Sequence, residues 1–243
     1  MPDSRRHRGA HPEDARLFGR DQWPALQRAS TELTWLLDRG YALRSSLALV
    51  GNRHGLTQRQ RLALARCTSD ATQCDRRRQH EVPRAAVAGA ELWIDGYNLL
   101  IAIESALGGG VILSGRDGCY RDLASLHGTY RTVSETLPAL GLIGETLASW
   151  RVPHCRWFLD RPVSNSARLR ILMLELATAN GWSWDVQLEF NPDPLLAASS
   201  AIIVSTDSFV LDRCAQWLNA ARHIIEAKVP HAHVVEPGLR FPE

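Results

Sequence analysis

The second half of the chain alternates short apolar runs with longer stretches of helical spacing, and this alternation strongly limits the possible folds. Runs that read as strands occur at 91–95, 111–113, 155–160, 184–190 and 201–205. Stretches that read as helices lie between and after them, at 97–107, 133–149, 166–180 and 208–222. Alternating strands and helices are typical of a parallel sheet with helices on both faces. We therefore predict an α/β fold, with a Rossmann-like parallel-sheet domain over residues 91–243.

The first part of the chain has a different pattern, which predicts helices. Residues 1–20 are polar without periodicity and are expected to form a disordered tail. Leu26, Ala29 and Leu33 share one face of a helix, and Thr57 with Gln60 has the spacing of a capping box. Residues 68–84 are polar and charged and predict an exposed connection. We expect a small helical domain over residues 21–88.

Charge is distributed unevenly between these two parts. Residues 1–90 contain 16 Arg, no Lys and 9 acidic residues, a net charge of +7, whereas the rest of the chain carries −5. A basic part joined to an acidic part is typical of a nucleic-acid-binding surface beside a metal site, so we expect RNA as a partner. An alternative explanation is arginine-rich codon usage, because 27 of the 28 basic residues are Arg.

Several classes of protein do not fit the sequence. No apolar run approaches the roughly 20 residues needed to cross a bilayer, and the N-terminus lacks the apolar core of a signal peptide, so we expect a cytoplasmic protein without membrane contact. The five Cys show no metal-binding spacing and are expected to be buried thiols. Gly108-Gly109-Gly110 lacks the lysine of a phosphate-binding loop and the spacing of a dinucleotide motif, so we expect no nucleotide cofactor.

Three of the expected strands end in, or lead into, an aspartate. Asp95 ends the first strand, Asp160 ends the third, and Asp207 follows the last. The carboxyl ends of parallel strands form the ligand-binding edge of such a sheet, where these carboxylates would converge. Their mutual repulsion would favour a hard divalent cation, Mg²⁺ or Mn²⁺. The alternative is that each aspartate only caps the helix that follows it.

Polar and basic residues near these strand ends are candidates for orienting water and binding a phosphodiester substrate. Asn98 and the hydroxyl residues around Asp207 could orient a water molecule or a phosphate group, and arginines could contact the substrate backbone. Intrachain ion pairs are the alternative role for the arginines near residue 120. The candidate substrate-binding residues are Ser205, Thr206, Ser208, Arg116, Arg121, Arg161, Ser164, Asn165 and Arg168.

Three short segments resemble the PIN/NYN superfamily of metal-dependent ribonucleases. "WIDGYNLL" looks like its opening strand and Asp-Gly-x-Asn turn, "WFLD" like an intermediate acidic strand, and "IIVSTDSFVLDRC" like a later strand with a Ser/Thr-x-Asp turn. The segments occur in the expected order within residues 91–225. The resemblance implies a Rossmann-like sheet, an acidic Mg²⁺ site and cleavage of single-stranded RNA.

The whole chain also resembles an uncharacterised prokaryotic family of the "domain of unknown function 434" type, which pairs a helical N-terminal domain with a PIN-like half. The resemblance rests on "LLDRGY", "LVGNRHGLTQRQRLAL", "SGRDGCYRDLASLHGTYR" and "LDRPVSNSARL". That family implies no activity and no oligomeric state.

One position departs from the PIN/NYN pattern. Phe209 stands where many such sites have a second acid after the later aspartate, so Asp117 or Asp212 is the expected additional metal ligand. Two functions stay open. The first is a metal-dependent phosphodiesterase, an endoribonuclease-type hydrolase with Asp95, Asp160, Asp207 and Asn98 as catalytic residues. The second is a non-catalytic RNA-binding or regulatory module with a degenerate PIN-like site.

Overall fold

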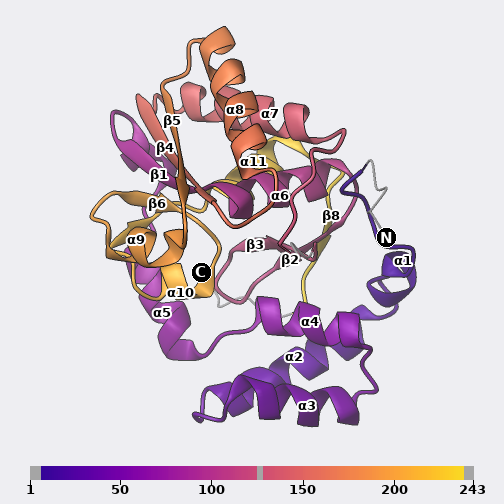
Figure 1. Cartoon of the computed structure of the whole chain (residues 1–243). Coiled ribbons are helices and arrows are strands. Elements are labelled where there is room, and N and C mark those ends of the chain that lie inside the picture. Colours follow the sequence, from indigo (N-terminus) through magenta and orange to yellow (C-terminus); the bar gives the residue numbers. More distant parts are fainter. Residues whose placement is uncertain (1–6, 125–127, 238–243) are drawn as a thin grey trace.

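A five-stranded parallel sheet, sheet A, forms the centre of the C-terminal half of the computed structural model, which describes residues 7–124 and 128–237 (Figure 1). Its strand order is β5-β4-β1-β6-β7, and every pairing is parallel. The predicted α/β class with a Rossmann-like parallel sheet is confirmed. The strands are β1 (Glu91–Asp95), β4 (His154–Asp160), β5 (Trp184–Glu189), β6 (Ile202–Val204) and β7 (Gln216–Trp217).

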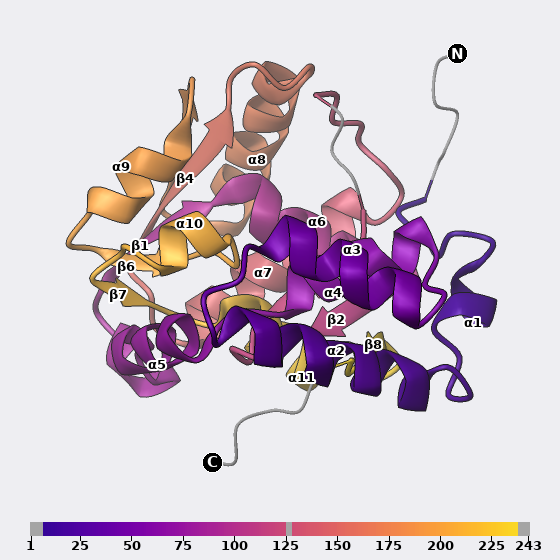
Figure 2. The same ribbon diagram turned by 90° about the horizontal axis from the view of Figure 1, so that it is seen from below.

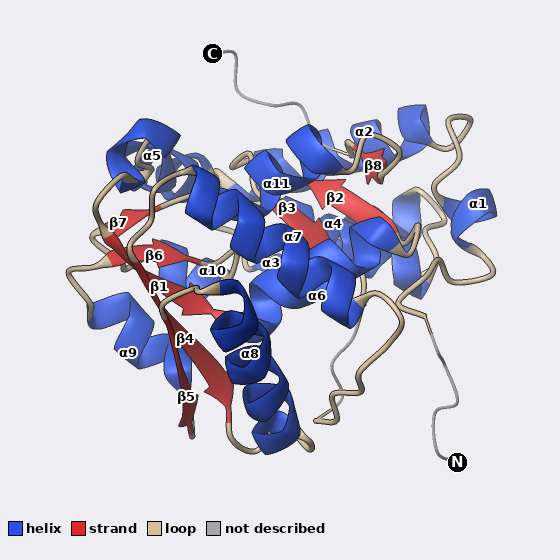
Figure 3. Ribbon diagram, turned by 90° about the horizontal axis from the view of Figure 1, so that it is seen from above, coloured by secondary structure: helices blue, strands red, loops and turns tan. Residues whose placement is uncertain are grey.

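Helices cover both faces of sheet A because its strands bury side chains on both sides. Along β4, Trp157 and Leu159 join the core on one face, whereas Phe158 joins the core on the other. Figure 3 shows α8 and α9 on opposite sides of the sheet. The first face is covered by α6 (Gly96–Leu107), α7 (Thr136–Ser149), α8 (Ser166–Asn180) and α11 (Ala220–Lys228), and the second by α9 (Pro192–Ala198) and α10 (Ser208–Leu211).

A second sheet, sheet B, lies beside sheet A and contains the run at 111–113 that we expected in the parallel sheet. It has the order β3-β2-β8, with β2 (Val111–Ser114), β3 (Tyr120–Asp122) and β8 (His233–Val235). The separate sheet forms because β2 is buried between two different cores. Ile112 packs with α6 and its neighbours, whereas Val111 and Leu113 pack with the N-terminal helices.

The N-terminal helices share a core with sheet B. Their apolar residues form one cluster with Val111, Leu113, Leu123 and Val235. The helical part is therefore attached to the rest of the molecule by a common core (Figure 1). Its elements are α1 (Asp14–Leu17), α2 (Trp23–Leu37), α3 (Leu43–Arg53), α4 (Gln58–Cys67), α5 (Ala71–His80) and the 3-10 helix η1 (Arg84–Val87).

Two polar segments are ordered where we expected irregular chain. Within 68–84, α5 begins with a capping box formed by Asp70 and Gln73, and its Arg77 is buried. Within 1–20, residues 1–6 lie outside the described residues, but α1 is helical and Arg8 Nε lies 2.9 Å from the buried Glu104 carboxylate. Ion pairs of Arg77 and Arg8 with carboxylates hold these two segments in place. The polar sequences alone do not indicate these ion pairs.

The expected helix at 208–222 is divided. α10 ends at Leu211, and β7 then pairs with β6 and buries Trp217 completely before α11 begins at Ala220. In the described part of the chain, no helix is both long and apolar enough to cross a bilayer.

Candidate functional site

Four aspartates lie at the carboxyl edge of sheet A because β5, β4, β1 and β6 are neighbours that run in the same direction. Asp160 and Asp95 end β4 and β1, and Asp207 follows β6. Asp193, on α9 directly after β5, is the fourth. Figure 2 shows α9 and α10 beside β1 and β6. We call these four residues the acidic site.

The Asp95-Gly96 turn positions the first of these carboxylates. A Cβ atom on Gly96 would lie 2.9 Å from the carbonyl oxygen of Phe158 and 2.5 Å from a methyl group of Leu159. Any larger residue would therefore push α6 away from β4. Glycine at this position lets α6 start immediately after the strand.

Hydrogen bonds join the ends of β1 and β6. The Ser205 hydroxyl donates to Asp95 Oδ2 at 2.8 Å and accepts from the Asp207 backbone N–H at 3.0 Å. The Thr206 hydroxyl donates a short hydrogen bond to Asn98 Oδ1. Ser205, Thr206 and Asn98 thus hold the backbone and carboxylates of this edge in place.

Helix capping, the alternative role for the aspartates, is present at two of the three predicted positions. Asp95 accepts from the Asn98 N–H at 3.4 Å, and Asp207 Oδ1 accepts from the N–H groups of Phe209 and Val210 at 2.8 and 3.2 Å. Asp160 does not cap a helix, because α8 begins only at Ser166. Asp95 and Asp207 can therefore cap their helices and also belong to the acidic site.

Burial and mutual repulsion perturb these carboxyl groups. Burial, aided by the charges of Asp193 and Asp207, raises the pKa of Asp95 to about 7, although the Ser205 hydrogen bond opposes the shift. Burial, together with Asp207 and Asp160, raises the pKa of Asp193. Burial also raises the pKa of Asp160. Such perturbed groups are concentrated at functional sites.

The acidic site also lacks counter-charge. Among the described residues, none of its four aspartates has an Arg, Lys or His side chain within 4 Å. By contrast, several other aspartates among the described residues are paired with arginines, although the half-buried Asp70 only caps α5. These pairs are Asp14 with Arg59, Asp38 with Arg116, Asp117 with Arg77 and Arg121, Asp122 with Arg66, and Asp212 with Arg77.

The donor chemistry of this edge suits a hard cation, but the ligands do not form a closed cage. Across residues 7–124 and 128–237, no three His, Cys, Asp or Glu side chains form a group that could hold a metal ion by themselves. Mg²⁺ commonly keeps several waters and uses one or two carboxylates together with substrate phosphates. The described residues therefore do not form a closed site of the structural zinc type.

Two members of this region were not among the predicted site residues. Asp193, in the proline-bracketed stretch 191–196 after β5, was only a spare acidic candidate, because of its position near a strand end. Tyr97 is only 5% exposed, and its hydroxyl has no hydrogen-bond partner in the described structure. Burial and the Asp160 charge raise the pKa of Tyr97. No pattern in the sequence indicates that Tyr97 belongs to this region.

The predicted additional ligands, Asp117 and Asp212, belong to a different cluster. Arg77 donates to Asp212 Oδ1 at 2.7 Å and to Asp117 Oδ2 at 2.6 Å, and Arg121 also pairs with Asp117 at 2.6 Å. The two arginines hold the pKa of Asp117 well below its usual range despite its burial. We assign both carboxylates to this buried ion-pair network, so Asp193 replaces them in the site.

The predicted substrate-binding residues also divide into two groups. Arg116 pairs with Asp38 at 2.8 Å and Arg121 is buried with Asp117, so both have intrachain ion pairs, the alternative that the sequence left open. By contrast, Arg161 and Arg168 are exposed and follow β4. Ser164, Asn165 and Ser208 are exposed at the starts of α8 and α10.

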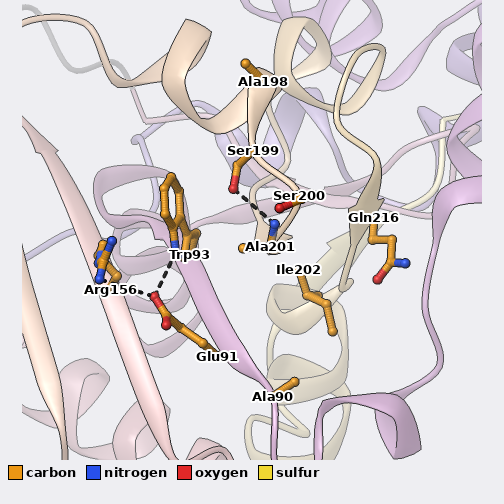
Figure 4. A pocket seen from close by; sticks show the side chains of 10 residues that line it. All are labelled: Ala90, Glu91, Trp93, Arg156, Ala198, Ser199, Ser200, Ala201, Ile202 and Gln216. Carbon is orange, nitrogen blue, oxygen red and sulfur yellow. Dashed lines mark hydrogen bonds and ion pairs between the residues drawn. The ribbon is translucent and has the colours of Figure 1, made fainter.

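An open hollow lies elsewhere, at the opposite end of the strands (Figure 4). It has a volume of about 720 Å³, and its lining includes the first residues of β1, β6 and β7. Trp93 Nε1 donates to Glu91 at 2.8 Å there, and Arg156 lies over the Trp93 ring. Ligands of open parallel sheets bind at the carboxyl ends of the strands. We therefore do not include this open hollow in the site.

Comparison with known proteins places the region that contains the acidic site in a family. The family model described as Domain of unknown function (DUF5616) matches residues 84–223, more than half of the chain. The chain belongs to this family. The DUF5616 region begins at η1 and includes all five strands of sheet A and all four aspartates.

The helices before the DUF5616 region match a second model. Residues 25–80, which cover α2 to α5, match Protein of unknown function (DUF434), as the sequence resemblance implied. An uncharacterized protein of Methanocaldococcus jannaschii is 24% identical over 200 residues, which cover 79% of this chain and 96% of that protein. No solved structure matches the chain.

Proposed function

We propose that this protein is a Mg²⁺- or Mn²⁺-dependent phosphodiesterase that cleaves RNA, with a PIN/NYN-like nuclease site. One observation carries the proposal: four aspartates lie at the ligand-binding edge of a parallel sheet without a basic partner among the described residues, whereas the buried Asp14 and Asp117 are paired with arginines. A divalent cation supplies the missing positive charge. Hard oxygen donors at an open site suit Mg²⁺ or Mn²⁺.

The residues of the edge have separable roles in this proposal. Asp95, Asp160, Asp193 and Asp207 hold the cation directly or through water. A bound cation of this kind polarises a phosphodiester and lowers the pKa of a coordinated water. Ser205 fixes the orientation of Asp95, and Asn98 with Thr206 fixes the adjoining backbone, so that the edge is preorganised for a substrate.

Exposed groups around the edge suit a single-stranded substrate. Phe190 and Phe209 are 72% and 42% exposed, and they follow β5 and Asp207. Arg213 lies over the Phe209 ring at 3.9 Å. Aromatic rings stack bases without sequence preference, and exposed arginines such as Arg161 contact phosphates.

A second candidate is a non-catalytic RNA-binding or regulatory module. Its support is that the described acidic residues form no three-ligand metal group and that Phe209 occupies the position of a second acid. In that case RNA would bind equally well with and without divalent cations.

Incubation of RNA with the protein and Mg²⁺ or Mn²⁺ distinguishes the two candidates. We expect wild type to cleave single-stranded RNA, chelator to abolish cleavage, and Asp95→Asn to lose it. Asp75→Asn, which changes an exposed aspartate on α5, is the matched control and should cleave like wild type. Equal cleavage by wild type and Asp95→Asn would point to a contaminant. RNA binding with no cleavage under any metal would favour the module.

A further inference from the structure

The exposed side of the α2–α3 hairpin combines large aromatic side chains with arginines. Trp35 and Tyr41 are 53% and 59% exposed, although aromatic rings of this size are normally mostly buried. Arg28 and Trp35 lie seven residues apart on one face of α2, and Arg39, four residues after Trp35, lies just beyond the end of that helix. Tyr41 follows in the connection between the two helices, which also leads to Arg44 at the start of α3. We call these five residues the hairpin surface.

The arginines of the hairpin surface are available to a partner. Across the described part of the chain, Arg28, Arg39 and Arg44 have no carboxylate within 4 Å, whereas Arg59 and Arg66 on α4 are paired with Asp14 and Asp122. The surface belongs to residues 1–90, which carry a net charge of +7. It therefore presents net positive charge to solvent, although Asp38 interacts electrostatically with the adjoining Arg39.

Trp35 and Arg39 are already arranged as a stacked pair. The Arg39 guanidinium lies 3.7 Å from the centre of the Trp35 ring and donates to the Trp35 carbonyl at 3.1 Å. This contact fixes a flexible side chain in advance. A planar ring stacked with a planar cation offers both a base-stacking surface and phosphate-binding N–H groups.

We propose that the hairpin surface is a binding site for single-stranded nucleic acid. Bases stack on Trp35 and Tyr41, and phosphates contact Arg28, Arg39 and Arg44. The interleaving of aromatic rings with unpaired arginines fits this ligand, because single-strand binding combines stacking platforms with a positive surface. The α2–α3 hairpin and α10 are seen from the same side of the molecule in Figure 2.

The charges argue against a second copy of the chain as the occupant. A symmetric dimer through this surface would place the same residues of both copies in contact. The three arginines of each copy would then face those of the other, and Asp38 beside Arg39 is already paired with Arg116. The like charges would repel each other strongly once solvent is excluded.

This site stands apart from the acidic site, so it does not require that the protein cleave RNA. Binding is therefore measured in excess chelator, by fluorescence anisotropy of a labelled oligo-uridine RNA of about 12 nucleotides, which is within the range of single-strand sites. We expect Trp35→Ala to weaken binding about tenfold, and Trp35→Phe to retain most of it. The double variant Arg39→Gln/Arg44→Gln should lower the salt dependence of log affinity by roughly 0.7 for each arginine.

Matched controls lie on α8, where Ile171 is 57% exposed and Arg170 is exposed without an ion pair among the described residues. Ile171→Ala and Arg170→Gln should bind like wild type. Absence of binding by wild type, or unchanged binding by Trp35→Ala and the double arginine variant, overturns the proposal. A concentration-dependent dimer that Trp35→Ala abolishes, without RNA binding, overturns it in favour of a subunit interface.

Discussion

The Ser205 hydroxyl donates a 2.8 Å hydrogen bond to Asp95, and so ties the end of β6 to the end of β1. The same oxygen accepts from the Asp207 N–H at 3.0 Å. One buried serine therefore sets the spacing between two aspartates of the acidic site. Its hydrogen bond to the charged form of Asp95 offsets only part of the cost of burying that carboxylate.

Asp95→Asn should stabilise the protein at neutral and alkaline pH when divalent cations are removed. Burial and the neighbouring carboxylates raise the pKa of Asp95 to about 7 in the folded state, above its ordinary value of 3.8. Ionisation therefore penalises the folded state increasingly from about pH 4, and the full penalty is present above pH 7. The pKa shift predicts that the unfolding free energy of Asp95→Asn exceeds that of wild type by a gap on the order of 4 kcal/mol above pH 7. Denaturant unfolding of both proteins at pH 4.5 and 8 in chelator measures it, and a gap that does not widen with pH contradicts the assignment.

Asp117→Asn and Asp193→Asn should have opposite effects. Asp117 lies between Arg77 and Arg121, so its loss leaves Arg121 without its carboxylate partner and Arg77 with only Asp212, and should cost about 3 to 5 kcal/mol of unfolding free energy. Asp193 has no basic partner among the described residues and is repelled by Asp207 and Asp160, so Asp193→Asn should leave stability unchanged or slightly raised. Thermal unfolding without metal measures both effects. A destabilised Asp193→Asn would show that this carboxylate is a structural residue.

Tyr97→Phe tests whether the Tyr97 hydroxyl acts at the acidic site, because the variant removes only the hydroxyl and keeps the packed ring. The ring contacts Tyr130 and is retained in the variant, and the hydroxyl it loses has no protein partner, so stability should change by less than about 1 kcal/mol. RNA cleavage should nevertheless fall about tenfold if the hydroxyl donates to a group at the acidic site, because such hydrogen bonds to charged groups are strong. Full activity with unchanged stability would exclude Tyr97 from the site.

Arg8→Ala should destabilise the protein although it lies in a segment whose sequence predicts disorder. Arg8 neutralises Glu104, which is completely buried and also accepts from Tyr130 and Thr136. Loss of one partner of a buried ion pair costs about 3 kcal/mol or more. Arg16→Ala, which removes only an exposed ion pair with Glu13, should change stability by less than about 1 kcal/mol. Equal unfolding midpoints for the two variants would show that the first segment is dispensable.

The sequence predicted the parallel sheet and three of its four edge carboxylates because both depend on local rules. Apolar runs define β1, β4 and β6, and neighbouring parallel strands end at one edge, so Asp95, Asp160 and Asp207 could be placed without coordinates. Asp193 could not be selected, because its proximity to Asp207 depends on how α9 folds back over the sheet. The strand at 111–113 was recognised, but its sheet was not, because strand pairing is a tertiary property.

The errors in the polar segments have a common physical cause. Arg77 is buried because Asp117 and Asp212, 40 and 135 residues away along the chain, neutralise it. The local sequence contains three consecutive arginines at 76–78, and this pattern predicts that their side chains are exposed. Arg8 is anchored in the same way by Glu104. Long-range ion pairs produce no periodic pattern in the sequence. Polar segments that they hold in place are therefore predicted to be irregular, and paired aspartates such as Asp117 are predicted to be metal ligands.

Titration of the metal-free protein with Mn²⁺, followed by electron paramagnetic resonance of the free ion, tests the central claim most directly. Wild type and Asp75→Asn should bind Mn²⁺ alike, and Mg²⁺ should compete. Asp95→Asn and Asp193→Asn should each weaken binding about tenfold or more, as expected for groups that hold or support a metal ion. No binding by wild type, or equal binding by all four proteins, would contradict a cation site at the carboxyl edge of sheet A.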